Sequence, residues 1–260
     1  MVKENFLTYP ISIGSYGRFV DEIFNLSEKK SSSYVCFANV HMTIEAYKDG
    51  DFNSVVQNAD IVAPDGQPLS LFFKYLKSID QDRVCGMDLL PDLLREAEKR
   101  GKSVYFYGTT TDVLNRIEER AKKEYPNLKI CGLYSPPFRR LSEDEKARIA
   151  EQINSAKPDF VFVALGCPKQ EKWMAEHKDK IQSCMLGLGQ AFHIYAETAS
   201  RSPEWMQRFS LEWAYRLYLE PGRLWKRYLY TNSYFLVLTC KYFVQNKVGT
   251  MFYRFANRIQ

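Results

Sequence analysis

The chain has little of the residue types that build metal and disulfide sites. Among its 260 residues are only three histidines, and its six cysteines include no CxxC pair. Three of the cysteines lie in apolar runs typical of buried strands, so we expect reduced core thiols and no zinc site. The N-terminus also lacks an uninterrupted apolar segment followed by a small-residue cleavage site, which predicts a cytoplasmic protein.

Two motifs that mark common nucleotide and metal sites are incomplete. The Gly-rich segment 187–193 lacks the full GxGxxG of dinucleotide-binding proteins and follows the last predicted strand rather than the first. The triplets 49–51 and 80–82 have DxD spacing, but neither follows an apolar strand, so we expect solvated turns and no metal. His177 is expected on the solvated side of a helix.

A net positive charge is absent from the first 200 residues and is confined to the last 60. Residues 201–260 hold ten Lys or Arg against three Glu, a net charge of +7, whereas the first 200 residues sum to −2. Tryptophan and tyrosine are interleaved with these cations, a mixture favoured at the level of lipid headgroups. Because no nucleic-acid-binding motif accompanies them, the expected partner is an anionic membrane surface and not a nucleic acid.

Short apolar runs alternate with amphipathic segments, a pattern typical of α/β proteins with a mostly parallel, Rossmann-like sheet and helices on both faces. The predicted strands are 34–39, 61–63, 104–107, 130–133, 160–165 and 184–188. The predicted helices are 41–58, 67–78, 88–100, 111–125, 142–156 and 169–181. We expect residues 1–200 to form the core and residues 201–260 a helical appendage. Ligands of such sheets bind at the carboxyl ends of the strands.

The basic tail also carries an apolar repeat. Trp205, Phe209, Trp213 and Leu217 recur every four residues, which predicts one apolar stripe along a helix. Such a stripe would dock on the core, face a membrane, or do both. The most apolar stretch, 234–239, is far shorter than the roughly 20 residues that span a bilayer, so we expect a membrane-facing lid and not an anchor.

Asp65 follows the second predicted strand in the sequence APDG (63–66). Asp-Gly after Pro is first of all a turn signal. A carboxylate at the end of a strand, beside a glycine that lets a ligand approach the backbone, is also a reasonable general base. Both interpretations stay open on the residues alone.

The loop after the fifth predicted strand reads GCPKQ (166–170). Gly166 permits a tight exit, Pro168 suits a first helical turn, and the helix N-terminus with Lys169 could bind a diphosphate. Gly and Pro are also common in any loop that joins a strand to a helix. His41 and His193 lie on two other loops at this expected ligand-binding edge.

Six ordered strings of sequence resemble the WecG/TagA/CpsF family, glycosyltransferase family 26, across residues 34–229. They are FANVHM (37–42), NADIVAPDG (58–66), RVCGMDLL (83–90), VYFYG (104–108), PDFVFVALGCPKQEKWM (158–174) and PEWMQRFSLEWAYRLYLEPGRLWKRYL (203–229). The last two are long, which makes the resemblance specific.

The resemblance implies an inverting glycosyltransferase of the α/β architecture called GT-E, with no metal requirement and no cofactor, because the UDP-sugar is a substrate. The implied acceptor is linked to polyprenyl diphosphate at the inner face of the cell membrane, in the synthesis of a bacterial surface polysaccharide or teichoic acid. Asp65 would be the catalytic base, and Arg83 and Gln170 would be further catalytic residues. Substrate contacts are expected at Asn39, His41, Gly66, Gln67, Gly108, Gly166, Lys169, Gln190, His193, Arg216 and Arg223.

Two positions depart from the family pattern, because Phe37 stands where some members have Thr and His193 where many have Asp. The donor sugar stays open among N-acetylmannosamine, its uronic acid, glucose and glucuronic acid, as do the acceptor sugar, the polymer and self-association. Two other functions remain to be weighed. A Rossmann-type oxidoreductase would need the missing Gly motif. A non-catalytic module that binds lipid headgroups or acts as a scaffold would give Asp65 no functional role.

Overall fold

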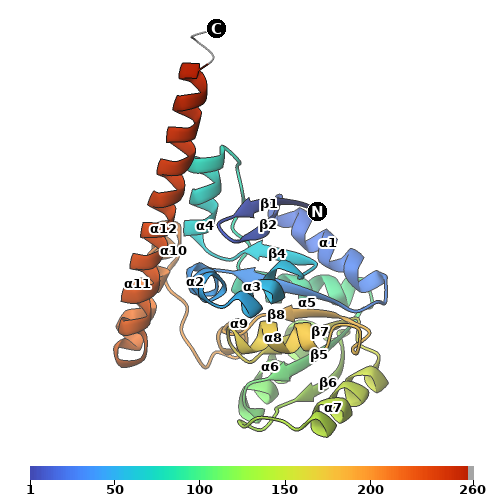
Figure 1. The fold of residues 1–260 in the computed structure, drawn as a ribbon. Coiled ribbons are helices and arrows are strands. Elements are labelled where there is room, and N and C mark those ends of the chain that lie inside the picture. The colour runs from blue at the N-terminus through green and yellow to red at the C-terminus, as the bar shows by residue number, and fades with distance from the viewer. Residues whose placement is uncertain (257–260) are drawn as a thin grey trace.

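Six parallel strands form the central sheet of the computed structural model, in the order β4-β3-β8-β7-β5-β6 (Figure 1). The model describes the backbone of residues 1–256 and the side chains of that range apart from Arg208 and residues 246–256. The strands are β3 (Ser33–Ala38), β4 (Ile61–Pro64), β5 (Ser103–Gly108), β6 (Lys129–Tyr134), β7 (Phe160–Ala164) and β8 (Cys184–Gly187). All six predicted strands are confirmed to within two residues.

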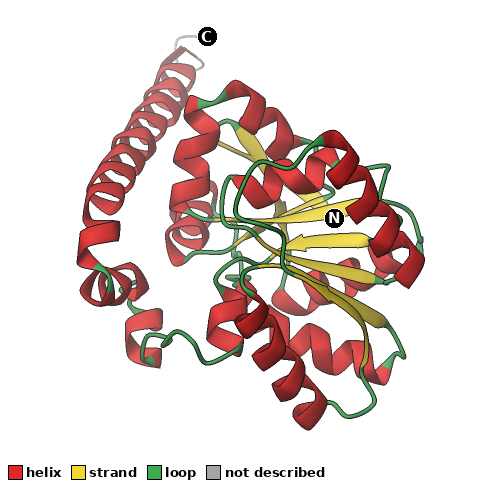
Figure 2. Ribbon diagram, turned by 90° about the horizontal axis from the view of Figure 1, so that it is seen from below, coloured by secondary structure: helices red, strands yellow, loops and turns green. Residues whose placement is uncertain are grey.

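Helices cover both faces of this sheet, as Figure 2 shows. In chain order they are α1 (Tyr16–Glu28), α2 (Val40–Lys48), α3 (Gly50–Gln57), α4 (Gln67–Phe72), the π-helical turn η1 (Phe73–Lys77), α5 (Gly86–Lys99), α6 (Thr111–Glu124), α7 (Glu143–Ala156), α8 (Lys169–Glu176), α9 (Ala191–Tyr195), α10 (Glu204–Arg208), α11 (Glu212–Leu219) and α12 (Pro221–Ala256). The predicted α/β class with a helical C-terminal appendage is confirmed.

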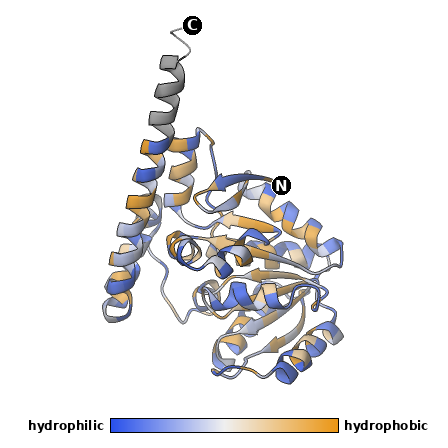
Figure 3. Cartoon of the chain, in the orientation of Figure 1, coloured by the Kyte–Doolittle hydropathy of each residue, from blue (hydrophilic) through white to orange (hydrophobic). Residues whose placement is uncertain are grey.

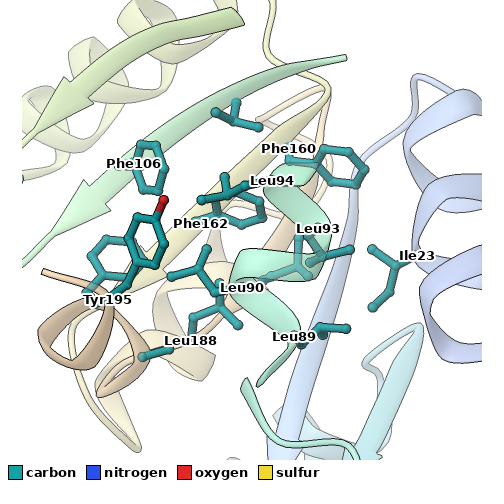
Figure 4. Close-up of a cluster of buried hydrophobic side chains, with 14 of the residues drawn as sticks. Ile23, Leu89, Leu90, Leu93, Leu94, Phe106, Phe160, Phe162, Leu188 and Tyr195 are labelled. Atoms are coloured by element: carbon teal, nitrogen blue, oxygen red, sulfur yellow. The ribbon is translucent and has the colours of Figure 1, made fainter. Parts of the chain in front are cut away.

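Alternate residues of each central strand point to opposite faces, so the sheet separates two hydrophobic clusters. On one face, Phe160 and Phe162 of β7 and Phe106 of β5 pack against a row of leucines on α5 (Figure 4). On the other face, Tyr105 and Tyr107 of β5 join residues of α2, α3, α7 and α8. Burial on both faces explains why these strands are nearly continuous apolar runs in the sequence.

The N-terminal 30 residues form elements that the sequence pattern did not predict. An antiparallel hairpin of β1 (Val2–Phe6) and β2 (Tyr9–Ile13) precedes α1. Gln81 ties this hairpin to the core, because its side chain accepts from the Gly14 amide and donates to the Gly14 carbonyl, each at 2.9 Å. Within the 80–82 triplet, Asp82 likewise accepts from the Tyr16 amide. The triplet therefore anchors the start of α1.

The extent of one helix and the surroundings of His177 were predicted wrongly. The helix expected over 41–58 is two helices, because the Asp49 carboxylate accepts from the Phe52 amide at 3.0 Å and caps a new helix, α3. His177 is not solvated but 1% exposed. Its ring stacks on Trp173, one helical turn away, with the ring centroids 4.2 Å apart. Trp173 in turn stacks on Tyr107 of β5, with the ring centroids 4.3 Å apart, which packs α8 against the sheet.

The tail folds back along the core, and its first segments are not one helix. Because α10 ends at Arg208 and α11 begins at Glu212, the predicted single stripe from Trp205 to Leu217 is broken. The long helix α12 instead packs on α2, as the Tyr47–Tyr234 ring pair illustrates (Figure 1). Figure 3 shows both apolar and polar residues along the coloured part of α12. Within the described part of the chain, no helix is long and apolar enough to cross a membrane.

Candidate active site

A cavity of about 430 Å³ opens at the carboxyl ends of the four adjacent strands β4, β3, β8 and β7, beneath α10, α11 and α12. The volume is in the range of small-molecule sites. Of the residues that the sequence analysis proposed for catalysis or binding, eleven line the cavity: Asn39, His41, Asp65, Gly66, Gln67, Arg83, Gly166, Gln170, Gln190, Arg216 and Arg223.

Asn39 and His41 enter the cavity at the N-terminus of α2. The Asn39 side chain caps this helix by accepting from the Met42 amide at 3.1 Å. His41 hydrogen-bonds the backbone of Cys167, and its Nδ1 is buried without a hydrogen-bond partner among the described residues. Burial and the nearby Arg227 lower the pKa of His41. The ring is therefore mainly neutral at pH 7, next to a helix terminus that favours anions.

Asp65 lies where β4 ends, and its position is fixed by the backbone. Its amide donates to the Ala38 carbonyl of β3 at 2.7 Å. Burial raises the pKa of Asp65 to about 7, and the nearby Glu212 carboxylate also raises it. A hydrogen bond from the Cys85 thiol and the charges of Arg83 and Arg216 act in the opposite direction. A carboxyl with a pKa near the working pH can both accept and hold a proton, as a general base requires.

Arg83 lies beside Asp65 and is held by carboxylates from two other elements. Its Nη1 is 3.3 Å from Glu212 Oε2 of α11, and its Nη2 is 3.4 Å from Asp88 Oδ2 of α5. A second contact between tail and core follows, because Arg201 Nη2 lies 2.5 Å from the other oxygen of Asp88. The core and the tail are thus joined by alternating charges at the edge of the cavity.

Gln170 is 6% exposed and is used to hold two loops together at the base of the cavity. Its Nε2 donates to the Gly187 carbonyl at 2.8 Å and to Glu171 at 2.9 Å, and its Oε1 accepts from the Gly166 amide at 3.2 Å. Both amide hydrogens are therefore occupied. Gln170 shapes the floor of the cavity from the loops after β7 and β8.

The tail contributes most of the positive charge of the cavity. Arg216, Arg223 and Arg227 all line it, and Arg216 Nη2 donates to Gln190 Oε1 at 3.3 Å. Arg223 is paired with Glu220 on the same side of the tail. Together with Arg83, these guanidinium groups make an anion-binding surface suited to phosphate oxygens.

Three proposed substrate-binding residues do not line the cavity. Gly108 has φ of 117°, and a Cβ there would lie 2.3 Å from the Ala164 carbonyl oxygen, so close packing of β5 on β7 explains this glycine. Lys169 is exposed because the first turn of α8 directs Gln170 and Glu171 inward instead. His193 faces Thr109, with 3.3 Å between Nε2 and the threonine hydroxyl.

Several lining residues were not proposed from the sequence. They include Glu171, Glu212, Thr231 and Asn232. Burial raises the pKa of Glu171 to about 7, since this side chain is 1% exposed. The one available signal for Glu212 is that it is among only three acidic residues in the basic tail. Among the side chains that the structure describes, no group of three or more His, Cys, Asp or Glu residues is arranged to hold a metal ion.

The geometry supports transfer chemistry on a phosphorylated substrate. A carboxylate with a pKa near neutrality lies on one wall, and guanidinium groups from core and tail surround the same space. The carboxylate can take a proton from a nucleophilic hydroxyl, and the cations can stabilise a departing phosphate.

Comparisons with known proteins identify a family and several relatives. The model of the "Glycosyl transferase WecG/TagA/CpsF family" matches residues 4–249. A protein of Bacillus subtilis (strain 168) named N-acetylglucosaminyldiphosphoundecaprenol N-acetyl-beta-D-mannosaminyltransferase is 34% identical over 212 residues, which are 81% of this chain and 80% of that protein. Proteins of the same name from Bacillus spizizenii and Staphylococcus aureus (strain NCTC 8325) are 32% and 24% identical over 80% and 78% of this chain, and 79% and 77% of their own lengths.

Proposed function

Because the chain belongs to the WecG/TagA/CpsF family of glycosyl transferases, we propose that it moves an N-acetylmannosamine residue from a UDP donor to an N-acetylglucosaminyl lipid diphosphate. The acceptor and the sugar are those in the names of its relatives. The observation that carries the proposal is the cavity in which Asp65 faces arginines of both the core and the tail.

In the proposed reaction Asp65 is the base. Its carboxylate takes the proton of the acceptor hydroxyl while that oxygen attacks the anomeric carbon of the donor. The bond from that carbon to the phosphate oxygen breaks, and UDP leaves with the electron pair from the opposite face. One displacement of this kind inverts the configuration at the anomeric carbon.

The leaving diphosphate and the acceptor diphosphate both need positive partners. The described residues supply them as Arg83 in the core and Arg216, Arg223 and Arg227 in the tail, all lining one cavity. Fixed guanidinium groups stabilise charge that develops on phosphate oxygens in the transition state. We propose that these groups act without a metal.

The tail also offers a surface for the membrane that holds a lipid-linked acceptor. Leu229, Leu236 and Val237 of α12 are 63–65% exposed, and Trp225 is 49% exposed, on a basic segment. Apolar side chains with surrounding cations favour binding to an anionic lipid surface. We propose peripheral association with the inner face of the cell membrane through this side of the tail.

The test is a transfer assay with purified chain and a short-chain N-acetylglucosaminyl lipid diphosphate. UDP-N-acetylmannosamine, its uronic acid counterpart, UDP-glucose and UDP-glucuronic acid are supplied separately, and UDP release and the disaccharide lipid are both measured. We expect product with UDP-N-acetylmannosamine and UDP release that depends on the acceptor. Binding of the lipid without turnover of any donor would instead favour the non-catalytic module.

A further inference from the structure

Arg83 is a cation of the core whose charge acts on the candidate base, yet both of its ion pairs are made with other carboxylates. Nη1 pairs with Glu212 at 3.3 Å and Nη2 pairs with Asp88 at 3.4 Å. The Arg83 and Glu212 side chains are only 16% and 22% exposed, so this pair is shielded from solvent more than a surface salt bridge is. Both terminal nitrogens of Arg83 are thus paired with carboxylates other than Asp65.

Asp65 has charged groups of both signs around it. Four charged or titratable groups act on it: Arg83, Cys85, Glu212 and Arg216. Cys85 donates a thiol hydrogen bond, but among the side chains described in the structure none forms an ion pair with Asp65. A direct Asp–Arg pair would depress the pKa of the carboxyl and weaken it as a base.

We propose that Glu212 is a positioning residue that holds Arg83 off Asp65 when the tail is docked, so that the carboxylate remains available to the acceptor hydroxyl. The inference rests on the proposed sugar transfer and adds to it a residue that acts through Arg83. Glu212 is 129 residues from Arg83 in the chain, and it reaches the core only because α11 covers the cavity.

The proposal makes the strength of the base depend on the tail. Glu212 is part of α11, and Arg201, which holds Asp88 from the other side, lies in the segment that leads into the tail. When α11 is undocked, Arg83 loses the partner of Nη1 and can turn toward Asp65. Undocking also removes the negative charge of Glu212, whose loss lowers the pKa of Asp65, and the positive charge of Arg216, whose loss raises it. These two losses oppose each other, so the approach of Arg83 to Asp65 sets the direction in which the pKa moves.

The decisive variant is Glu212→Gln, which keeps the size of the side chain and removes its charge. Sugar transfer is measured from pH 5 to pH 9 at saturating substrate, with thermal unfolding and UDP binding measured in parallel. We expect the acid-side midpoint of kcat to fall by about one pH unit and the plateau rate to fall several-fold, because a weaker base is a poorer catalyst. UDP affinity and the unfolding temperature should stay close to those of the unchanged chain.

Glu197→Gln serves as the matched control, because Glu197 is 77% exposed and pairs with Arg120 outside the cavity. It should leave the midpoint and the plateau unchanged. Asp88→Asn removes the other restraint on Arg83 and should shift the midpoint in the same direction. If Glu212→Gln does not fold, Asp88→Asn tests the same inference by releasing Arg83 through a residue of the core.

A second readout separates this inference from the proposed function. The pKa of Asp65 is followed by carbon NMR of labelled aspartate, with Asp65→Asn to assign the signal, and it should be lower in Glu212→Gln than in the unchanged chain. If the unchanged chain transfers no sugar, the proposed function fails and the NMR titration still decides the positioning role. A pKa and a kcat midpoint that do not move in Glu212→Gln, or a loss confined to KM, would overturn the inference.

Discussion

Arg216 of α11 donates to Gln190 of the loop after β8, with 3.3 Å between Nη2 and Oε1. This contact joins the tail to the carboxyl-end edge of the sheet, next to the ends of β3 and β4. The tail is therefore part of the wall of the candidate active site, and its residues are expected to affect catalysis as well as membrane binding.

Arg216→Ala is expected to impair transfer more than folding. Loss of a charge-assisted contact to a phosphate corresponds to a decrease in kcat/KM of roughly 10- to 100-fold. Lys241→Ala, which removes the same charge from an exposed position of α12, is the control and should transfer normally. Equal activity of the two variants would show that Arg216 does not contact substrate.

Asp65→Asn should keep the fold and UDP binding but lower turnover by roughly a hundredfold or more, the size expected for loss of a general base. Because burial raises the pKa of Asp65 to about 7, the active ionised form increases as pH rises through 7. The rate of the unchanged chain should therefore climb between pH 6 and pH 8. Turnover near normal in Asp65→Asn would exclude this residue as the base.

The strands were predictable because a parallel strand buried on both faces is an apolar run, and the strand-end loops were predictable because such strands end at one edge. Asp65 could be proposed for that reason. The hairpin of β1 and β2 was missed because VKENF has no clear alternation of apolar and polar residues. Glu212 was not predicted as a site residue because its partner Arg83 is 129 residues away in the chain. An ion pair over such a separation cannot be predicted from the neighbouring residues.

Gln170 shows the limit of assigning roles by resemblance. Gln170 lines the cavity, but both of its amide hydrogens are donated to Gly187 and Glu171. A catalytic role for its amide would need one of these bonds to break. The sequence places a residue at a site, whereas the hydrogen bonds decide which of its atoms are available there.

Glu171→Gln is expected to alter the pH dependence of stability. Burial raises the pKa of Glu171 from 4.5 to about 7, so the folded state holds its proton more tightly than the unfolded chain does. The protonated Glu171 side chain therefore stabilises the folded state fully below pH 4.5, and this contribution is lost as pH rises to 7. Between pH 4.5 and pH 7 the free energy of unfolding of the variant should therefore rise by roughly 3 kcal/mol relative to that of the unchanged chain. The measurement is chemical unfolding at several pH values. Glu151→Gln, on the exposed side of α7, should show no such gain.

Transfer should continue in the presence of EDTA, because Arg83, Arg216, Arg223 and Arg227 supply positive charge around the cavity. The measurement is UDP release by chain dialysed against EDTA, with and without added Mg²⁺ or Mn²⁺. Activity lost on chelation and restored by either ion would contradict the proposal that arginines alone stabilise the leaving group.

Two faces of α12 are expected to have separable roles. Phe235 and Leu238 are each 7% exposed, and the Phe235 ring lies 6.3 Å from that of Phe6 in the N-terminal hairpin. Leu229 and Leu236, in the same helix, are 65% and 63% exposed. The first pair should hold the tail on the core, and the second should contact lipid.

Phe235→Ala should therefore cost about 3–5 kcal/mol of unfolding free energy, the usual loss for a buried phenylalanine. The double change Leu229→Ser and Leu236→Ser should leave unfolding unchanged but weaken binding to anionic liposomes and transfer to a long-chain lipid acceptor. Transfer to a short-chain, water-soluble acceptor should be normal in that variant, because the cavity is intact. If the double serine variant binds liposomes as well as the unchanged chain does at low salt, this side of α12 is not the membrane contact.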